Sequence, residues 1–203
     1  MLIGVGLGPG SPELLTLKAV ETLKKSHKVY VPGRMAAELV APYAEAEILD
    51  FPMLTDYNVL NEVWTKNAEL IAEESRHNLV SFGLIGDPNF FSTFTHLKRV
   101  MNRLYPDVET ATIPGISSIT SFASRADAEV DASFEVSDGS EKAYKIVLKA
   151  TRPLEIIDSM KKEGYNKFTF AQRLFMDDEI IIKELKKIPE KGNYFSIVFG
   201  QKE

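Results

Sequence analysis

The sequence of 203 residues contains no cysteine, which excludes disulfide bonds, thiolate metal sites and cysteine nucleophiles. Its three histidines, His27, His77 and His96, show neither HxH nor HxxxH spacing, so no metal site is expected. No apolar run reaches the length of a membrane span, and no basic patch with a cleavage site indicates a secretory signal. The net charge of −5, without a basic cluster, argues against nucleic acid as a partner. We therefore expect a cytoplasmic enzyme or a small-molecule-binding protein.

What the sequence does contain is a run of alternating glycines at its start. Gly4, Gly6, Gly8 and Gly10 occupy every second position of MLIGVGLGPG. Because glycine lets backbone amides approach a bound molecule, this run predicts a ligand-binding loop after a short strand. A dinucleotide fingerprint needs glycines at its first, third and sixth places, and the sixth place counted from Gly4 is Pro9. The expected ligand is therefore not NAD.

The first half of the chain alternates strand patterns with helix patterns, which indicates a mostly parallel sheet. Short apolar stretches predict strands at residues 28–31, 48–51, 79–85 and 108–113. Helical periodicity predicts helices at residues 11–25, 59–75 and 92–104. In the first helix the expected buried face is Leu14, Leu17, Val20 and Leu23, and in the second the candidates for burial are Val63, Trp64 and Ile71.

The second half has more strand patterns than helix patterns, which predicts a mixed sheet that is antiparallel in part. Helices are predicted at residues 117–125 and 154–162. Strands are predicted at residues 134–136, 146–149, 168–171, 180–185 and 194–199. We therefore expect two α/β domains, residues 1–112 and residues 113–203.

Three predicted strands end in glycine and proline followed by polar, helix-capping residues. The segments are GLGPGSPE, IGDPNFFST and IPGISS. Glycine and proline end strands in most proteins, which is one reading of each segment taken alone. In an open α/β sheet, however, ligands bind beyond the carboxyl ends of the strands. Three such segments together therefore favour a ligand crevice.

The polar residues of these segments have two readings. Asp87 either accepts hydrogen bonds from a ligand or bonds its own backbone in a turn. Ser92 and Thr93, like Ser117 and Ser118, either cap the following helix or contact a ligand. Cationic side chains near predicted strand ends either bind the carboxylates of an anionic substrate or are solvated surface charges; they are Arg34, Arg125, Lys149, Arg152 and Arg173.

No nucleophile–base pair and no GxxxxGK[ST] phosphate loop is present in the sequence. This absence suits a reaction in which a cofactor brings the reactive group, while the protein positions the reactants and excludes water.

Taken together, VGLGPGSPELLTLKAVETL, FGLIGDPNFFSTFTHL and TIPGISSITSFAS resemble the tetrapyrrole (corrin/porphyrin) methyltransferases. Within that family the chain is most similar to the branch that methylates C-20 of precorrin-2 or cobalt-factor II. Further segments carry this narrower resemblance: PYAEAEILDFPM, ATRPLEIIDSM, QRLFMDDEIII and YFSIVFG. The resemblance covers nearly the whole chain.

The resemblance implies S-adenosylmethionine as the cofactor, S-adenosylhomocysteine as its product and an active site in a trough between two α/β domains. It also implies a tetrapyrrole substrate, a homodimer, and no protein nucleophile. Matching positions imply that the cofactor is contacted by Pro9, Gly83, Leu84, Ile85, Asp87, Phe90, Ser92, Thr93, Ser117, Ser118, Leu148, Arg173 and Leu174. Against the substrate we expect Gly8, Arg34, Arg125 and Arg152.

Two alternatives stay open. The first is an enzyme of the same fold that acts at another ring carbon or on diphthamide. The second is a non-catalytic module that binds S-adenosylmethionine or a corrinoid. The second is kept open by residues 126–145, a stretch shorter than the resemblance leads us to expect.

We predict that Asp87→Ala weakens cofactor binding by roughly 1–3 kcal/mol if the hydrogen bonds of its carboxylate are buried. Isothermal titration calorimetry measures this change directly. An unchanged affinity would leave Asp87 as a turn residue only.

Overall fold

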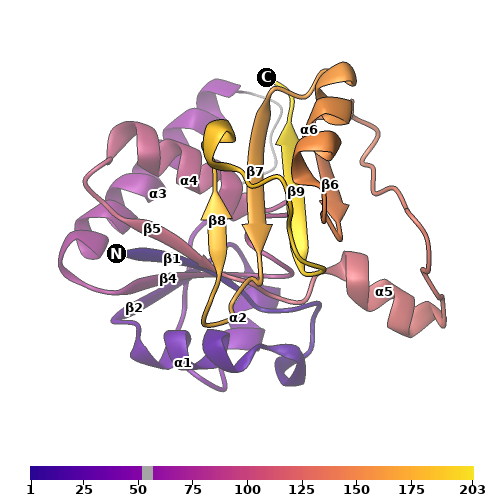
Figure 1. Cartoon of the computed structure of the whole chain (residues 1–203). Coiled ribbons are helices and arrows are strands. Elements are labelled where there is room, and N and C mark those ends of the chain that lie inside the picture. Colours follow the sequence, from indigo (N-terminus) through magenta and orange to yellow (C-terminus); the bar gives the residue numbers. More distant parts are fainter. Residues whose placement is uncertain (52–56) are drawn as a thin grey trace. The chain divides into compact units, whose positions relative to one another are not determined.

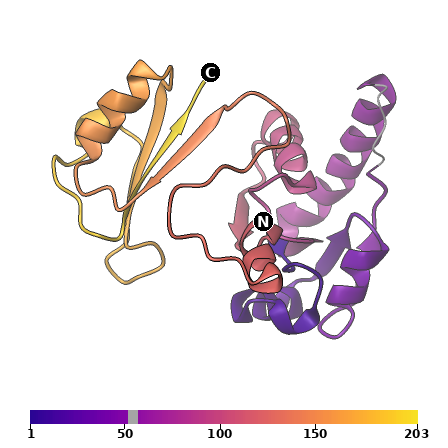
Figure 2. The same cartoon turned by 90° about the vertical axis from the view of Figure 1, so that its right-hand side faces the viewer.

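The structure is a computed structural model that describes residues 1–51 and 57–203, and these residues group into two compact units. Unit 1 is Met1–Phe134 and unit 2 is Glu135–Glu203. Each is described by itself below (Figures 1 and 2). The domain limits expected from the sequence, 1–112 and 113–203, stay a prediction.

Unit 1 is built on a parallel sheet of five strands in the order β3-β2-β4-β1-β5. The strands are β1 (Leu2–Gly6), β2 (Lys28–Val31), β3 (Glu47–Ile48), β4 (Val80–Leu84) and β5 (Thr110–Ile113). The helices are η1 (Pro12–Leu14), α1 (Leu17–Lys25), α2 (Arg34–Val40), α3 (Tyr57–His77), α4 (Thr93–Leu104) and α5 (Ser118–Ala126). The alternation of strands and helices over this part of the chain agrees with the sequence pattern.

Helices α1 and α2 cover one face of the parallel sheet, and α3 and α4 cover the other (Figure 1). The first face packs Ala19 and Leu23 of α1 against Val5 and Val31 of the sheet. Because α1 follows β1 and α4 follows β4, the chain leaves these two adjacent strands toward opposite faces. Such a reversal is where ligands bind in open α/β sheets, just outside the carboxyl ends of the strands.

The α3–α4 face is the more aromatic of the two. Phe82 of β4 and Phe94 of α4 are fully buried in it, and Ile71 of α3 is too, as predicted. Trp64, a predicted candidate for burial, packs against this core with its ring centroid 4.6 Å from that of Phe51. This aromatic layer holds two helices against three strands of the sheet.

Unit 2 is an antiparallel sheet of four strands in the order β6-β9-β7-β8, with α6 on one face (Figure 2). Its elements are β6 (Tyr144–Leu148), α6 (Pro153–Lys162), β7 (Lys167–Gln172), β8 (Ile180–Ile182), η2 (Leu185–Lys187) and β9 (Ser196–Gln201). Helix α6 begins at a proline, carries Glu155 in its first turn and ends in Lys161 and Lys162, an arrangement that suits the helix dipole. Its buried residues Ile157 and Met160 pack with Phe170 and Val198 of the sheet.

The predicted fold class is confirmed: the chain is α/β, with a parallel first sheet. The second sheet was expected to be mixed, and its described pairings are all antiparallel. The strand expected at residues 134–136 is wrong, because residues 127–143 contain no helix or strand. Phe134 and Val136 alternate like a strand, but both side chains are exposed, so no apolar face is buried there.

The first helix also differs from its prediction. The segment expected as one helix over residues 11–25 is divided into η1 and α1, with an extended Leu15 and Thr16 between them. The side chain of Thr16 accepts a hydrogen bond from the amide of Ala19 and so sets a new helix start. Because a new helix starts after Thr16, the residues before and after it do not share one helical face. Leu17 is therefore 91% exposed instead of buried, whereas Leu23 is buried as expected.

Gly4 of β1 lies beneath the ring of Phe94, and a Cβ at that position would stand 2.5 Å from two of its ring carbons. We therefore predict that Gly4→Ala lowers the free energy of unfolding by about 1–3 kcal/mol, the usual cost of overpacking. Urea denaturation measures it. Gly33→Ala is the matched control, because its Cβ would meet nothing within 4 Å and its backbone is extended. Equal effects of the two substitutions would contradict the prediction.

Candidate functional site

The three segments singled out in the sequence follow strands β1, β4 and β5, which are neighbours in the parallel sheet. In a parallel sheet the carboxyl ends of all strands lie at one edge. The segments therefore lie together within unit 1, as the sequence predicted. We call them the β1 loop (7–11), the β4 loop (85–92) and the β5 loop (114–117).

Backbone hydrogen bonds join the β1 loop to the β4 loop. These two loops leave adjacent strands toward opposite faces of the sheet, and we call this place the reversal point. The amide of Leu7 donates to the carbonyl of Leu84 at 2.8 Å, and the amide of Gly86 donates to the carbonyl of Gly8 at 2.8 Å. Gly8 and Gly86 form an antiparallel bridge, and both have left-handed backbone with φ of 76° and 79°. Glycine is needed here because other residues seldom adopt this conformation.

The last residue of β1 also touches the β4 loop and the β5 loop through glycines. A Cβ on Gly115 would stand 2.1 Å from the carbonyl oxygen of Gly86, and a Cβ on Gly6 would stand 2.4 Å from the amide nitrogen of Gly115. We call Gly6, Gly86 and Gly115 the glycine contact. The interpretation of the alternating glycines as ligand-facing is therefore wrong for Gly4 and Gly6, whose neighbours are other parts of the protein. At Gly10, by contrast, nothing lies within 4 Å of a would-be Cβ.

Asp87 is buried, and both of its carboxylate oxygens accept backbone hydrogen bonds. One oxygen accepts from the amide of Asn89 at 2.8 Å, which is the turn bond weighed from the sequence. The other accepts from the amide of Gly115 at 3.1 Å and so reaches the β5 loop. The cofactor contact expected of Asp87 stays a prediction.

The serines of the loops cap helices. The hydroxyl group of Ser92 accepts a hydrogen bond from the amide of Thr95 and donates one to the carbonyl of Pro88, and Ser92 is buried. The hydroxyl oxygen of Ser117 accepts from the amide of Ile119 at the start of α5. Thr93 is half-buried and Ser118 is exposed. Ser92 and Ser117 thus cap helices, which is one of the two roles that the sequence left open for them. Ligand contacts of Ser92, Thr93, Ser117 and Ser118 stay a prediction.

A recess of about 210 Å³ lies beside the β1 and β4 loops. Its lining residues are Gly10, Pro12, Met35, Glu38, Leu39 and Ile85. Three of them belong to α2, a helix that we did not predict. The run RMAAELV after Pro32 and Gly33 is a helix pattern, and it was the available signal. Glu38 is the one ionisable side chain in this lining.

The remaining residues of unit 1 that were predicted to contact the cofactor differ in their solvent exposure. Gly83 and Leu84 lie inside β4 and are buried, and the side chain of Leu84 packs in the core. Pro9 is half-buried, and Ile85 and Phe90 are exposed beyond the end of β4. Of the residues expected near the substrate, Gly8 lies in the backbone bridge, whereas Arg34 begins α2 and Arg125 lies in the last turn of α5, both exposed.

In unit 2 the predicted residues gather at one end of the sheet. Strands β6 and β7 both pair antiparallel with β9, so their carboxyl ends point the same way and carry Leu148, Arg173 and Leu174. The amide of Arg173 donates to the carbonyl of Phe195, and its guanidinium pairs with Asp178 at 2.7 Å. Arg152, at the start of α6, is exposed and pairs with Glu155. Unit 2 thus brings three of the predicted cofactor residues together.

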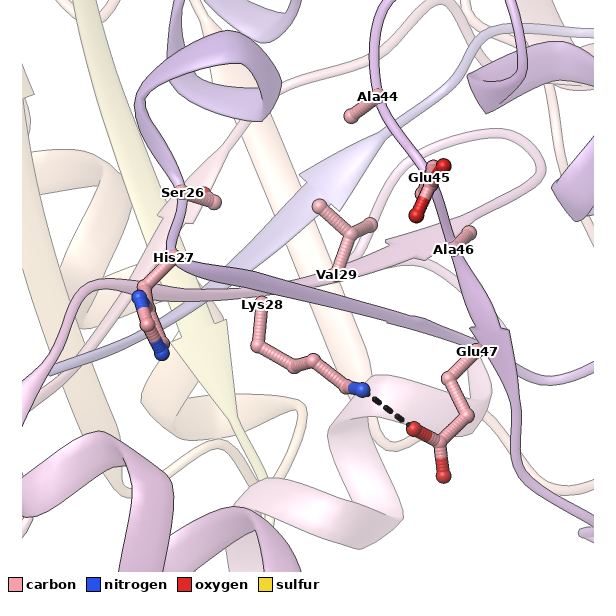
Figure 3. A pocket seen from close by; sticks show the side chains of 8 residues that line it. All are labelled: Ser26, His27, Lys28, Val29, Ala44, Glu45, Ala46 and Glu47. Carbon is pink, nitrogen blue, oxygen red and sulfur yellow. Dashed lines mark ion pairs between the residues drawn. The ribbon is translucent and has the colours of Figure 1, made fainter.

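Another pocket, of about 370 Å³, lies at the start of β2 and is drawn in Figure 3. It is lined by Ser26, His27, Lys28, Val29, Ala44, Glu45, Ala46 and Glu47. Lys28 and Glu47 point toward each other and form an ion pair at 2.5 Å, and this hydrogen bond raises the pKa of Lys28 (Figure 3). The pocket is at the amino end of its strand, away from the reversal point that favours ligands. We therefore take the recess as the candidate site.

Over the described ranges 1–51 and 57–203, the chain has no helix that is both long and apolar enough to cross a membrane. The same residues contain no group of three or more histidine or acidic side chains arranged to hold a metal ion.

The fold and the loops after β1, β4 and β5 define a protein of the α/β class with two units. Residues 1–184 match the family described as Tetrapyrrole (Corrin/Porphyrin) Methylases, so the chain belongs to this family.

Within this family, the chain is similar to curated proteins named as C(20)-methyltransferases. The chain is similar to a probable cobalt-precorrin-2 C(20)-methyltransferase of Methanocaldococcus jannaschii, with 37% identity over 132 residues, which cover 61% of this chain and 55% of that protein. It is also similar to a cobalt-precorrin-2 C(20)-methyltransferase of Salmonella typhimurium, with 31% identity over 136 residues, 62% of this chain and 56% of that protein. The chain thus spans about half the length of the curated relatives it matches.

Solved structures share the fold. A precorrin-6Y methylase from Archaeoglobus fulgidus superposes with a TM-score of 0.51 and 24% identity, covering 100% of this chain and 98% of that chain.

Ser92 gives a prediction about stability. We expect Ser92→Ala to lower the free energy of unfolding by about 1–2 kcal/mol, because it removes the cap of α4. Urea denaturation measures this, with the neighbouring Thr93→Ala as the control. Thr93 is the first helical residue, where alanine is a good helix former, so its replacement should change stability by less than about 0.5 kcal/mol. A Ser92→Ala protein as stable as the unsubstituted one would contradict the capping role.

Proposed function

We propose that the protein is an S-adenosylmethionine-dependent C-methyltransferase that acts at C-20 of precorrin-2 or cobalt-factor II in cobalamin biosynthesis. The choice of substrate rests on the similarity to two relatives named as cobalt-precorrin-2 C(20)-methyltransferases. Membership of the tetrapyrrole methylases supports the reaction type. The recess at the carboxyl edge of the parallel sheet supports a binding site for a small molecule.

The recess suits S-adenosylmethionine in its chemistry. When bound, this cofactor supplies an electrophilic methyl group on a positively charged sulfur. Glu38 offers a carboxylate in the lining, which suits a cationic ligand. Met35, Leu39 and Ile85 give the lining an apolar part, and Gly10 leaves its backbone open to a ligand.

The residues of the chain would position the cofactor and the substrate and would not react with them. We propose that the β1 and β4 loops orient the cofactor, and that Leu148, Arg173 and Leu174 of unit 2 contact it as the family resemblance implies. Arg34 and Arg125 are exposed cations that would hold substrate carboxylates. Holding two reactants in contact geometry and keeping water out supplies a large part of the rate in such transfers.

The working form that we propose is a cytoplasmic homodimer. Its support is the family resemblance, and sedimentation of the purified protein tests the dimer.

Methyl transfer tests the proposed function. We predict that the protein moves a labelled methyl group from S-adenosylmethionine to precorrin-2 or cobalt-factor II, with the new methyl at C-20 in the product NMR spectrum. Uroporphyrinogen III, other precorrins and a diphthine-bearing protein serve as competing substrates. Label on another ring carbon would replace the C-20 assignment. Tight cofactor binding without transfer to any tetrapyrrole would favour a binding module.

A variant that fills the recess tests whether the cofactor binds there. Ile85→Trp places a large side chain in the recess, so we expect it to weaken S-adenosylhomocysteine binding at least about tenfold by steric exclusion, at about 1.4 kcal/mol per tenfold change. Leu70→Trp on α3 is the matched control, because Leu70 and Ile85 are both 39% exposed. Calorimetry measures both. Equal affinity of the two variants would move the site away from the recess.

A further inference from the structure

We propose that strand β6 of unit 2 is an interface for a second copy of this chain, in which the β6 strands of two copies pair antiparallel about a two-fold axis at Ile146. The choice of a second copy as the partner rests on the homodimer of the proposed function. The interface is argued from unit 2 alone, and its test needs neither cofactor nor substrate.

Strand β6 lies at one edge of the sheet of unit 2 (Figure 1). Among the residues that the structure describes, β6 pairs with β9 only. The amide of Lys202 donates to the carbonyl of Ala143 at 2.9 Å, so residue 143, directly before β6, faces β9. Because the hydrogen-bonding direction alternates along an antiparallel strand, the amides and carbonyls of Tyr144, Ile146 and Leu148 are directed away from β9. This edge therefore offers backbone donors and acceptors to another strand.

The two edges of this sheet differ in their protection against an added strand. Strand β8, at the opposite edge, has three residues and directly follows Asp177, Asp178 and Glu179. A short edge and nearby charges are the usual protection. Strand β6 has five residues, and Lys145 is its one charged side chain. Both carboxylate oxygens of Glu163 accept from Lys145 at 2.7 Å, so this charge is already compensated. The β6 edge is therefore the less protected of the two.

The side chains of β6 add an apolar strip along this edge. Tyr144, Ile146 and Leu148 are 56%, 47% and 63% exposed. They alternate with residues that face α6, and Tyr144 stacks on Phe199 of β9 with the ring centroids 5.9 Å apart. A second strand at this edge would continue the strip and cover part of each of these side chains.

The sequence of β6 is complementary to itself in the antiparallel direction. With Ile146 on the two-fold axis, it meets Ile146 of the other copy. Tyr144 then meets Leu148, and Lys145 meets Val147, so no lysine faces a lysine. Because the pairing uses the backbone edge, the exposed face of Leu148 stays open for the cofactor contact expected of this residue.

The charges that flank β6 are complementary across the same axis. Asp138 and Glu141 precede β6, whereas Lys149 and Arg152 follow it. Antiparallel pairing brings the residues before β6 in one copy beside those after β6 in the other. Lys142, next to Glu141, is engaged in an ion pair within its own copy. Acidic side chains of each copy would therefore lie near cations of the other, which favours a second copy as the occupant.

Residues 127–137 of the same chain are the competing occupant. Polar and apolar residues alternate along this segment, and it is followed by Asp138 and Gly139, a dipeptide typical of hairpin turns. In the structure the segment forms no strand, and Val130, Phe134 and Val136 are exposed. Its pairing with β6 is therefore an alternative that the experiments below must separate from a second copy.

A single cysteine on the axis tests the interface directly, because the chain contains no cysteine. In the proposed pairing the two Cα atoms of residue 146 are about 5.5 Å apart, which suits a disulfide. We expect Ile146→Cys to form a covalent dimer under mild oxidation, seen by non-reducing electrophoresis. Ile181→Cys on β8 is the matched control, because Ile181 is 53% exposed and lies at the opposite edge. Equal cross-linking of the two variants would overturn the proposal.

Sedimentation of the full chain tests the interface without a covalent bond. We expect the unsubstituted protein to be a dimer and Ile146→Lys to raise the dimer Kd at least about tenfold, because two like charges would meet on the axis. Ile181→Lys should leave the Kd unchanged. A protein that sediments as a monomer at every concentration would overturn the proposal, and so would a dimer that tolerates Ile146→Lys. If the lysine variant does not fold, the cysteine variant still decides.

Amide hydrogen exchange separates the two occupants. Pairing between copies predicts that the amides of Tyr144, Ile146 and Leu148 are better protected at high than at low protein concentration. Protection that does not depend on concentration would mean that residues 127–137 cover β6, and it would overturn the second copy. A protein that cross-links at residue 146 and transfers no methyl group would contradict only the proposed activity. A protein that transfers the methyl group and does not cross-link would contradict only this interface.

Discussion

The close contact among Gly6, Gly86 and Gly115 is the constraint on which the rest of unit 1 depends. The end of β1 and the loops after β4 and β5 meet there with no room for a side chain, so each of these neighbouring strands must end at a fixed register. The parallel pairing of β1 with β4 and with β5 supplies that register. The backbone bonds between the β1 and β4 loops then continue the sheet beyond its strands. These bonds and contacts restrain the loops within the protein itself, and a restrained site loses less entropy when a ligand binds.

The recess owes its form to the same arrangement. Its floor comes from the β1 and β4 loops and its wall from α2, the helix on the α1 side of the sheet. Leu39 of α2 is both a core residue and a lining residue, so the packing of that face fixes the wall in place. A site on such a support keeps its geometry, whereas a site on long loops must be ordered by its ligand.

Several features could be predicted from the sequence because their causes are local. Alternating strands and helices, the capping by Ser92, and the position of the three loops follow from apolar period and from glycine and proline. The restart of α1 at Thr16 depends on one side-chain hydrogen bond that competes with the earlier Ser11–Pro12 signal, and pattern alone does not decide between them. The tight fit of Gly6 against Gly115 depends on residues more than a hundred positions apart in the sequence. The second bond of Asp87 is equally long-range, which is why the sequence left its two roles open.

The shortest strand of the parallel sheet has a bearing on solubility. Strand β3 is an edge strand of two residues, and its Glu47 is held in an ion pair with Lys28 of the adjacent strand. An exposed sheet edge is a template on which another polypeptide can add a strand, and natural proteins limit that hazard with short edges and charged side chains. The β3 edge has both properties. Unit 1 therefore protects one side of its sheet from aggregation with only two residues and one pair of opposite charges.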